Sequence, residues 1–178
     1  MARSMAMATR GKQKPKRDHI IYLAGIIDAD GSVSISRATP RGVVNPRYVL
    51  EVNVVNTSTE LMAWLLETFG GRMVARRMSK PEVQRPTFDW KYSNGKAMWL
   101  LELVEPFLIV KRERAQLGIK LIKHWTTNHG QGARLDPDEV ARREFIYQRM
   151  KELNRFGIVQ PQRLSLPAPA ETQDDAIV

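Results

Sequence analysis

The stretch that decides the fold is YLAGIIDADGSVSIS, from Tyr22 to Ser36. Its first half has the small and apolar spacing of a packed helix, and its second half alternates polar and apolar residues like a half-buried strand. Asp28 and Asp30 stand at the junction, directly before Gly31. Unpaired carbonyl groups make the C-terminal end of a helix negative, so carboxylates there are disfavoured by some tenths of a kcal/mol. We therefore expect a positive partner near this junction.

The composition indicates a folded protein with a polyanionic partner. The chain has 178 residues, of which 43% are hydrophobic, so it can form one domain with a sizeable core. It has no cysteine, which excludes disulfides and zinc–thiolate sites, and no apolar run of the roughly 20 residues that a membrane helix needs. Lysine and arginine number 28 against 19 acidic residues, giving a net charge of +9. This balance favours nucleic acid as the partner, although a basic protein without such a partner is the alternative.

The two ends of the chain differ from the part between them. Residues 1–17 contain six basic residues and no acidic one, which predicts a flexible basic arm able to touch phosphates. An organelle transit peptide is the alternative for this arm. Residues 161–178 are rich in proline and alanine and carry acidic residues, which predicts a disordered tail. We therefore expect a single domain over residues 18–160.

Hydrophobic periodicity predicts the elements of this domain. Helices are expected over residues 18–27, from a capping box at 57–60 through 69, and over residues 96–104, 111–125 and 136–156. Strands are expected over residues 32–38, 47–55, 72–77 and 88–92. Asp18 and Asp136 are the expected N-caps of the first and last helices, and Gly70 with Gly71 ends the second. This order predicts an α+β fold with antiparallel hairpins.

Two neighbouring carboxylates after a helix admit more than one interpretation. An EF-hand loop counted from Asp28 would need glycine at position six and glutamate at position twelve. Gly31 falls at position four and Thr39 at position twelve, so a calcium loop of this kind fails. The two aspartates could still be turn residues that end a helix.

The segment LAGIIDADG, Leu23–Gly31, resembles the signature of the LAGLIDADG homing endonucleases and differs from it only at Ile26. The chain agrees with that family in the order and spacing of its elements from Asp18 to Trp125. The resemblance implies the family fold, in which two copies of the motif helix pair across a two-fold axis beneath a saddle-shaped antiparallel sheet. The motif positions assigned to this dimer interface and junction are Leu23, Ala24, Gly25, Ile27, Asp28 and Gly31, with Ala24 and Gly25 allowing close approach.

The same resemblance implies a metal ion at the end of the motif. Asp30, helped by the backbone carbonyl of Ala29, would hold a divalent cation at the scissile phosphate, and Asp28 would satisfy backbone groups at the helix junction. Mg²⁺ suits such a site because it takes carboxylate, phosphate and water oxygens as ligands. We expect Mn²⁺ to substitute, and Ca²⁺ to support binding without cleavage. Magnesium would then be the positive partner that the helix end requires.

Two further positions match the family. The segment VEPFLIVKRERA, residues 104–115, resembles the one that carries a catalytic lysine, which assigns that role to Lys111; an ordinary phosphate-contacting lysine is the alternative. Asn56 stands where relatives have a polar residue, often glutamine, that positions water at the metal, and a turn residue is the alternative there. Because the motif occurs once, we expect a homodimer and a roughly palindromic duplex.

The polar faces of the two hairpins are the expected DNA contacts. A two-stranded ribbon fits the major groove and can reach base edges there, and the family uses its sheet in this way. In the first hairpin the candidates on the polar face are Ser32, Ser34, Ser36, Arg47, Glu51 and Asn53, and Arg37 and Arg41 are further candidates near the turn. In the second they are Arg76 or Arg77, Asp89 and Lys91, with Phe88, Trp90 and Tyr92 in the core. A one-residue slip of the second hairpin would exchange its faces, and a merely solvated polar face is the alternative.

The sequence therefore predicts a site-specific double-strand DNA endonuclease of the single-motif LAGLIDADG type. The resemblance implies Mg²⁺-dependent hydrolysis at a long pseudo-palindromic site, short 3′ overhangs and association with an intron. An RNA-binding intron maturase and a non-cleaving DNA-binding regulator of the same fold are the alternatives. Neither the target site nor the host of the chain follows from the sequence.

Overall fold

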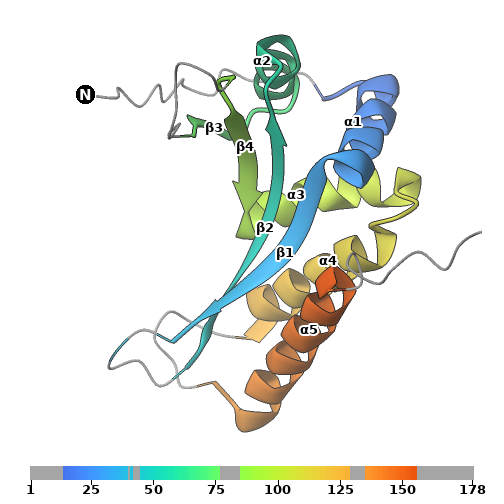
Figure 1. Cartoon of the computed structure of the whole chain (residues 1–178). Coiled ribbons are helices and arrows are strands. Elements are labelled where there is room, and N and C mark those ends of the chain that lie inside the picture. Colours follow the sequence, from blue (N-terminus) through green and yellow to red (C-terminus); the bar gives the residue numbers. More distant parts are fainter. Residues whose placement is uncertain (1–13, 40, 42–44, 77–84, 129–134, 156–178) are drawn as a thin grey trace, which may run out of the picture.

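The structure is a computed structural model, and it describes residues 14–39, 41, 45–76, 85–128 and 135–155 (Figure 1). The predicted α+β architecture is confirmed: five α-helices and a short 3₁₀ helix accompany one antiparallel four-stranded sheet in this part of the chain. Most of the predicted basic arm and the whole predicted tail lie outside the described residues, as does Arg77. No helix of the described part is long and apolar enough to cross a membrane.

The motif helix is α1, Arg17–Ala29. It begins after Lys16 and makes no side-chain cap, so the predicted N-cap Asp18 lies within the first turn instead. One side of α1 is buried in the core, and the helix ends when the Asp30 amide donates to the carbonyl oxygen of Ile26 at 2.8 Å. The chain then turns sharply into the sheet at Gly31, where a Cβ atom would lie 2.7 Å from the Cα of Ile27.

The sheet places β1 (Gly31–Ala38), β2 (Arg47–Asn56), β4 (Phe88–Ser93) and β3 (Arg72–Ala75) side by side in that order. One face of the sheet is apolar because the strands alternate, and it packs with the helices into a single core. The predicted faces of the second hairpin are confirmed, since Trp90 and Tyr92 are buried while Lys91 pairs in register with Asn53 on the other face.

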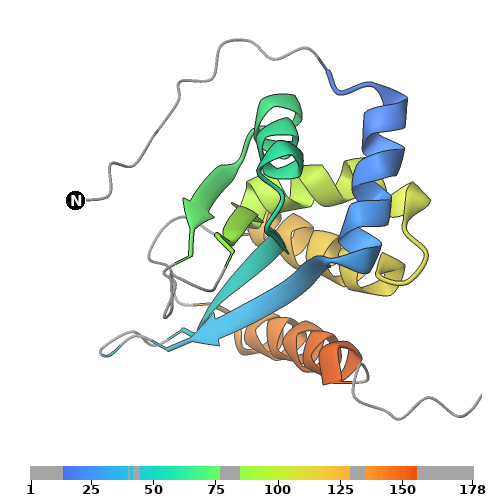
Figure 2. The same ribbon diagram turned by 45° about the horizontal axis from the view of Figure 1, so that its top comes forward.

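The remaining helices cover the apolar face and continue beyond it (Figure 2). They are α2 (Thr59–Thr68), α3 (Asn94–Val104), the 3₁₀ helix η1 (Glu105–Phe107), α4 (Arg112–Asn128) and α5 (Pro137–Arg155). The N-cap of α2 is Ser58, whose hydroxyl accepts from the Leu61 amide at 3.2 Å. The predicted capping box from Thr57 to Glu60 is therefore wrong, because the helix begins one residue later and has leucine where the box needs glutamate or glutamine. Asp136 precedes α5 and accepts hydrogen bonds from its first amides, as predicted for an N-cap.

Candidate active site and nucleic-acid interface

The junction between α1 and β1 is tied to the start of α4 by the carboxylate of Asp28. Its oxygens accept hydrogen bonds from the backbone amides of Ile109 (2.6 Å), Val110 (3.2 Å) and Lys111 (2.9 Å). Partial burial acts to raise the pKa of Asp28, but these three amides and the charge of Lys111 outweigh it and hold that pKa below its ordinary value. Asp28 therefore lies at the C-terminal end of one helix and at the favourable N-terminal end of another.

Lys111 supplies positive charge at the negative end of α1. Its ammonium group donates to the carbonyl oxygens of Ile27 at 2.8 Å and of Asp28 at 2.6 Å, which are among the carbonyls that a helix end leaves unpaired. Burial lowers the pKa of the Lys111 amine, and the carboxylates of Asp28 and Asp30 oppose that shift. The positive partner of this helix end is thus present in the chain itself, where the sequence had led us to expect magnesium alone.

Asp30 and Asn56 lie together at the edge of this junction. Asp30 is exposed, and the side-chain amide of Asn56 donates to its Oδ2 at 3.4 Å. Asn56 is itself oriented by the Ser58 amide, which donates to its Oδ1 at 2.9 Å at the start of α2. The end of β2, the end of α1 and the start of α4 therefore bring Asn56, Asp30 and Lys111 to one place, although 81 positions separate Asp30 from Lys111 in the sequence.

The donor set at this place is compatible with a hard divalent cation. Among the described residues, no group of three or more histidine, cysteine, aspartate or glutamate side chains is placed to hold a metal. The chain offers the exposed carboxylate of Asp30 and nearby backbone carbonyls, which are all oxygen ligands. Mg²⁺ is commonly bound by one or two carboxylates together with water and phosphate oxygens, so this sparse set fits it. A cation that requires a complete protein cage does not fit.

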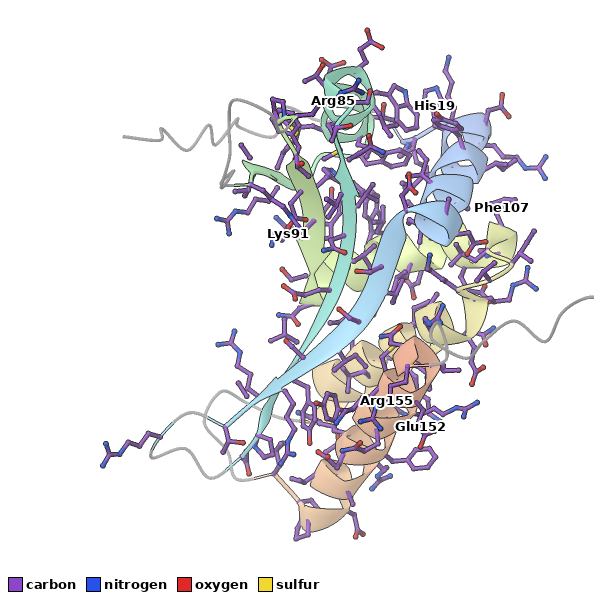
Figure 3. All side chains as sticks on the ribbon, in the orientation of Figure 1. His19, Arg85, Lys91, Phe107, Glu152 and Arg155 are labelled. Atoms are coloured by element: carbon purple, nitrogen blue, oxygen red, sulfur yellow. The ribbon has the colours of Figure 1, made fainter. Side chains whose placement is uncertain are left out.

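The face of the sheet that the helices leave open carries mostly polar side chains, with Val49, Val55 and Val74 among them. The register aligns one row of polar side chains across all four strands, and this row consists of Ser32, Asn53, Lys91 and Arg72. Ser32 donates to the side-chain oxygen of Asn53 within this row. A second row joins Ser34, Glu51 and Ser93. Lys91 extends from β4 away from α1 and α3 (Figure 3).

Arg72 was missed by the sequence reasoning, although its signal was present. It is the first residue of the short strand β3 and pairs with Lys91. Alternation along the second hairpin would have placed it on the polar face once Lys91 was placed there. The sequence alone did not fix the pairing of Arg72 with Lys91, because β3 has four residues and a long connection separates it from β4.

An acidic side chain organises the basic groups of the second hairpin. Asp89 is nearly buried, and its Oδ2 lies 3.5 Å from both the Arg76 guanidinium and the Lys91 ammonium. Its Oδ1 is buried without a hydrogen-bond donor among the described residues. Asp89, predicted to contact DNA, is therefore already engaged by two cations, and the more exposed Arg76 is the group that this cluster presents to solvent.

Several predicted site residues lie elsewhere than expected. Arg37 faces the helices, because it pairs with Tyr48 in the ladder and forms a 3.3 Å ion pair with Glu144 of α5. It is thus not on the open polar face. Leu23, Ala24 and Ile27 are buried inside the chain, so these side chains have no surface to offer a second copy.

The exposed face of α1 carries other residues than the buried motif positions. Ile21 and Tyr22 are 43% and 57% exposed, and a Cβ on the exposed Gly25 would meet nothing within 4 Å. Ile109 and Val110, which contact the end of α1 through Asp28, are 86% and 67% exposed. Large exposed apolar side chains grouped in this way are typical of an interaction surface. We call these five residues the open α1 face.

Comparison with solved structures finds the same fold in homing endonucleases. The chain aligns with the homing endonuclease I-CvuI, in complex with its target and with calcium, at a TM-score of 0.62 and 17% identity over 77% of this chain and 82% of that chain. It aligns with the archaeal intron-encoded homing endonuclease I-Vdi141I, complexed with DNA, at a TM-score of 0.62 and 20% identity over 78% of this chain and 86% of that chain. It aligns with the LAGLIDADG homing endonuclease I-GzeII, in complex with its DNA target, at a TM-score of 0.59 and 13% identity over 84% of this chain and 54% of that chain. No protein-family model and no curated protein matches the sequence.

Proposed function

From the LAGLIDADG homing endonuclease fold that this chain has, and from the geometry at the end of α1, we propose that it is a site-specific double-strand DNA endonuclease. The observation that carries the proposal is the exposed carboxylate of Asp30, which lies at the rim of the open polar face. Lys111 and Asn56 come to the same place from two other elements. A polyanion lying on that face would present its phosphates to this group.

Asp30 and the carbonyl of Ala29 are the groups that would hold Mg²⁺. The ion would supply charge stabilisation at the phosphate and a more acidic water. Lys111 fixes the end of α1 through two backbone carbonyls, so it sets where the carboxylate of Asp30 points. Its ammonium also contributes positive charge where negative charge develops on a phosphate. Asn56, held by the Ser58 amide, orients the Asp30 carboxylate through its own amide group.

The base contacts of the proposed complex come from the open polar face. Major-groove edges are read by hydrogen bonds from a ribbon of this width, and arginine, asparagine and glutamate each have a preferred base edge. The side chains that we assign to base or phosphate contact are Ser32, Ser34, Ser36, Arg41, Arg47, Glu51, Asn53, Arg72, Arg76 and Lys91. The net charge of +9 supports the proposal, since phosphate contacts supply much of the affinity of such proteins.

The active protein is proposed to be a homodimer formed through the open α1 face. The chain has one motif and covers 54% of the I-GzeII chain, so a little under half of that chain lies outside the aligned part. Pairing two copies of α1 would cover Ile21, Tyr22 and Gly25 and bring two Asp30 carboxylates to adjacent sites. A two-fold protein then matches a pseudo-palindromic duplex. Short 3′ overhangs and intron association are proposed from the resemblance alone.

The experiment that tests this proposal is a selection on a library of randomised long duplexes in Mg²⁺ and in Ca²⁺. We expect cut ends to be enriched in Mg²⁺, and bound but uncut duplexes in Ca²⁺. Asp30→Asn should lose cleavage and retain folding, whereas the control Asp138→Asn, an exposed aspartate at the start of α5, should cleave normally.

The outcomes separate the alternatives. Binding in both ions without cut ends would replace the nuclease with a DNA-binding regulator of the same fold. Absence of both binding and cutting in a deep library, together with retention of a structured intron RNA, would replace it with a maturase. Equal loss of cleavage in Asp30→Asn and Asp138→Asn would remove Asp30 from its proposed role.

A further inference from the structure

The first hairpin extends beyond the rest of the sheet. The β2–β4 ladder begins at Glu51, whereas the β1–β2 ladder continues outward to the pair Ala38 and Arg47 (Figure 1). Residues 35–38 and 47–50 thus form a two-stranded projecting ribbon. Two strands without further support are marginally stable in water, so this ribbon needs a partner on one face.

The helix α5 lies along the projecting ribbon and is attached at both ends of that contact. Near the outer end, Glu144 binds Arg37 at 3.3 Å; near the inner end, the Asn154 amide donates to the carbonyl oxygen of Val33 at 3.2 Å. Ten helical residues span about 15 Å and four strand residues about 13 Å, so the two elements match in length over this distance. Figure 2 shows α5 running beside the outer part of β1.

Glu144 is the centre of the outer attachment. Its Oε2 accepts a 2.5 Å hydrogen bond from the hydroxyl of Tyr48 and pairs with Arg37, while its Oε1 accepts from Gln148 at 2.8 Å. Burial and the neighbouring carboxylate raise the pKa of Tyr48 to about 12, as expected for a phenol that donates its proton in a hydrogen bond to a carboxylate. One carboxylate thus binds both strands of the projecting ribbon to α5.

The inner part of α5 is fixed to the helix that begins at the candidate active site. Arg149 of α5 forms a 2.7 Å ion pair with Glu113, and Arg114 donates to the carbonyl oxygen of Leu153 at 2.6 Å. Both partners belong to the first turn of α4, directly after Lys111. A continuous set of contacts therefore links the end of α1 to the projecting ribbon through α4 and α5.

We propose that α5 is a specificity element, in which Glu144 holds the projecting ribbon in the shape that reads the outer base pairs of each half-site. This inference rests on the proposed function. Glu144 is a positioning residue: it faces the helices, and the side chains that would meet DNA, such as Ser36 and Arg47, lie on the opposite face of the ribbon. Loss of Glu144 should therefore weaken the base preference at the outer base pairs of each half-site. The base preference at the inner base pairs should stay unchanged.

The test uses Glu144→Ala and the milder Tyr48→Phe in the full chain, with Glu152→Ala as the control. Glu152 lies on the same helix, near the end of α5 (Figure 3). Among the partners that the structure describes it contacts only Arg149, at 3.4 Å. The first measurement is amide hydrogen exchange without DNA. We expect exchange in the projecting ribbon to rise about tenfold or more, because local opening loses a hydrogen bond to a charged group.

The second measurement is the base preference at each position of the selected target. We expect Glu144→Ala to lose preference at the outermost base pairs of each half-site, with unchanged preference at the inner pairs and unchanged cleavage of the best target. Unchanged exchange in the ribbon, or faster exchange with an unchanged preference profile, would overturn the inference. If the native chain selects no duplex, the proposed function itself fails, and the exchange data still show whether α5 supports the ribbon.

Discussion

Gly25 and Gly31, the two glycines of the motif, have different structural roles. Gly31 starts β1 against the backbone of α1, where a Cβ would lie 2.7 Å from the Cα and 2.9 Å from the carbonyl oxygen of Ile27. Backbone atoms cannot rotate away as the end of a side chain can. Gly25 is on the open α1 face, where a Cβ would meet nothing in the chain itself. The fold requires Gly31, whereas only a partner would require Gly25.

This contrast predicts opposite effects of the same substitution. Gly31→Ala should lower the free energy of unfolding by about 1–3 kcal/mol or more, because the added methyl overpacks a rigid contact. Gly25→Ala should raise the stability of the single chain by up to about 1 kcal/mol, because alanine favours a helix interior more than glycine does. Denaturant unfolding measures both, at protein concentrations low enough to keep the chain monomeric. Equal destabilisation by the two variants would contradict the geometry described above.

Lys111 has a structural task in addition to its proposed catalytic one. Lys111→Ala removes the donor to two carbonyls at the end of α1, so we expect a loss of about 1–3 kcal/mol in stability together with loss of cleavage. The control is Arg112→Ala, because the Arg112 guanidinium is exposed and donates only to the Pro106 carbonyl among its described contacts, at 3.2 Å. Thermal unfolding and cleavage are measured on each. A Lys111→Ala variant with native stability would show that the amine is not needed to hold the helix end.

At the scale of the elements, local patterns predicted most of what the structure shows. Alternation along β2 and β4 placed Trp90 in the core and Lys91 outside, and two glycines ended α2, because these features depend on neighbours in the chain. The contact of Lys111 with Ile27 and the pairing of Arg37 with Glu144 join residues 84 and 107 positions apart. Such contacts depend on how helices pack on the sheet, and periodicity in one sequence does not contain that information.

The attachment of α5 predicts a pH dependence of stability. Partial burial acts to raise the pKa of Glu144, but the Tyr48 hydroxyl, the Gln148 amide and the charges of Arg37 and Lys151 outweigh it, so this pKa is below its ordinary value of 4.5. A carboxylate with a lowered pKa stabilises the fold above its ordinary pKa, and the contribution is lost as the pH falls through the lowered one. Glu144→Gln should therefore be less stable than the native chain at pH 7, and the difference should narrow as the pH falls from 7 through 4.5 and below.

Denaturant unfolding across that pH range measures the effect, and a double-mutant cycle assigns it. In a Tyr48→Phe background, Glu144→Gln should cost less, because the two residues share one hydrogen bond. A constant difference between Glu144→Gln and the native chain at all pH values would show that the charge of Glu144 is not what attaches α5 to the ribbon.

At the level of the whole molecule, α4 and α5 together connect the two regions that the proposed reaction needs. The start of α4 holds the Asp28 carboxylate at one end of the junction, and its first turn is bound by α5. The sheet then extends from Asp30 at the inner end to the projecting ribbon at the outer end (Figure 1). A duplex on the open polar face would contact both, so the position of the proposed cleavage and the proposed base contacts would be set by one connected set of elements.

The proposed homodimer depends on the open α1 face. Ile21→Glu places a charge on the open α1 face at a side chain that is already exposed in the single chain, so the fold should persist while pairing of two copies is lost. Sedimentation should show a dimer for the native chain and a monomer for Ile21→Glu. The variant should also lose cleavage of the full target while retaining weak binding to one half-site. Phe145→Glu is the matched control, because Phe145 is an exposed apolar residue on α5, away from α1. If Phe145→Glu dissociates the dimer and Ile21→Glu does not, the two copies pair through α5, and the two Asp30 carboxylates would need another route to adjacent phosphates.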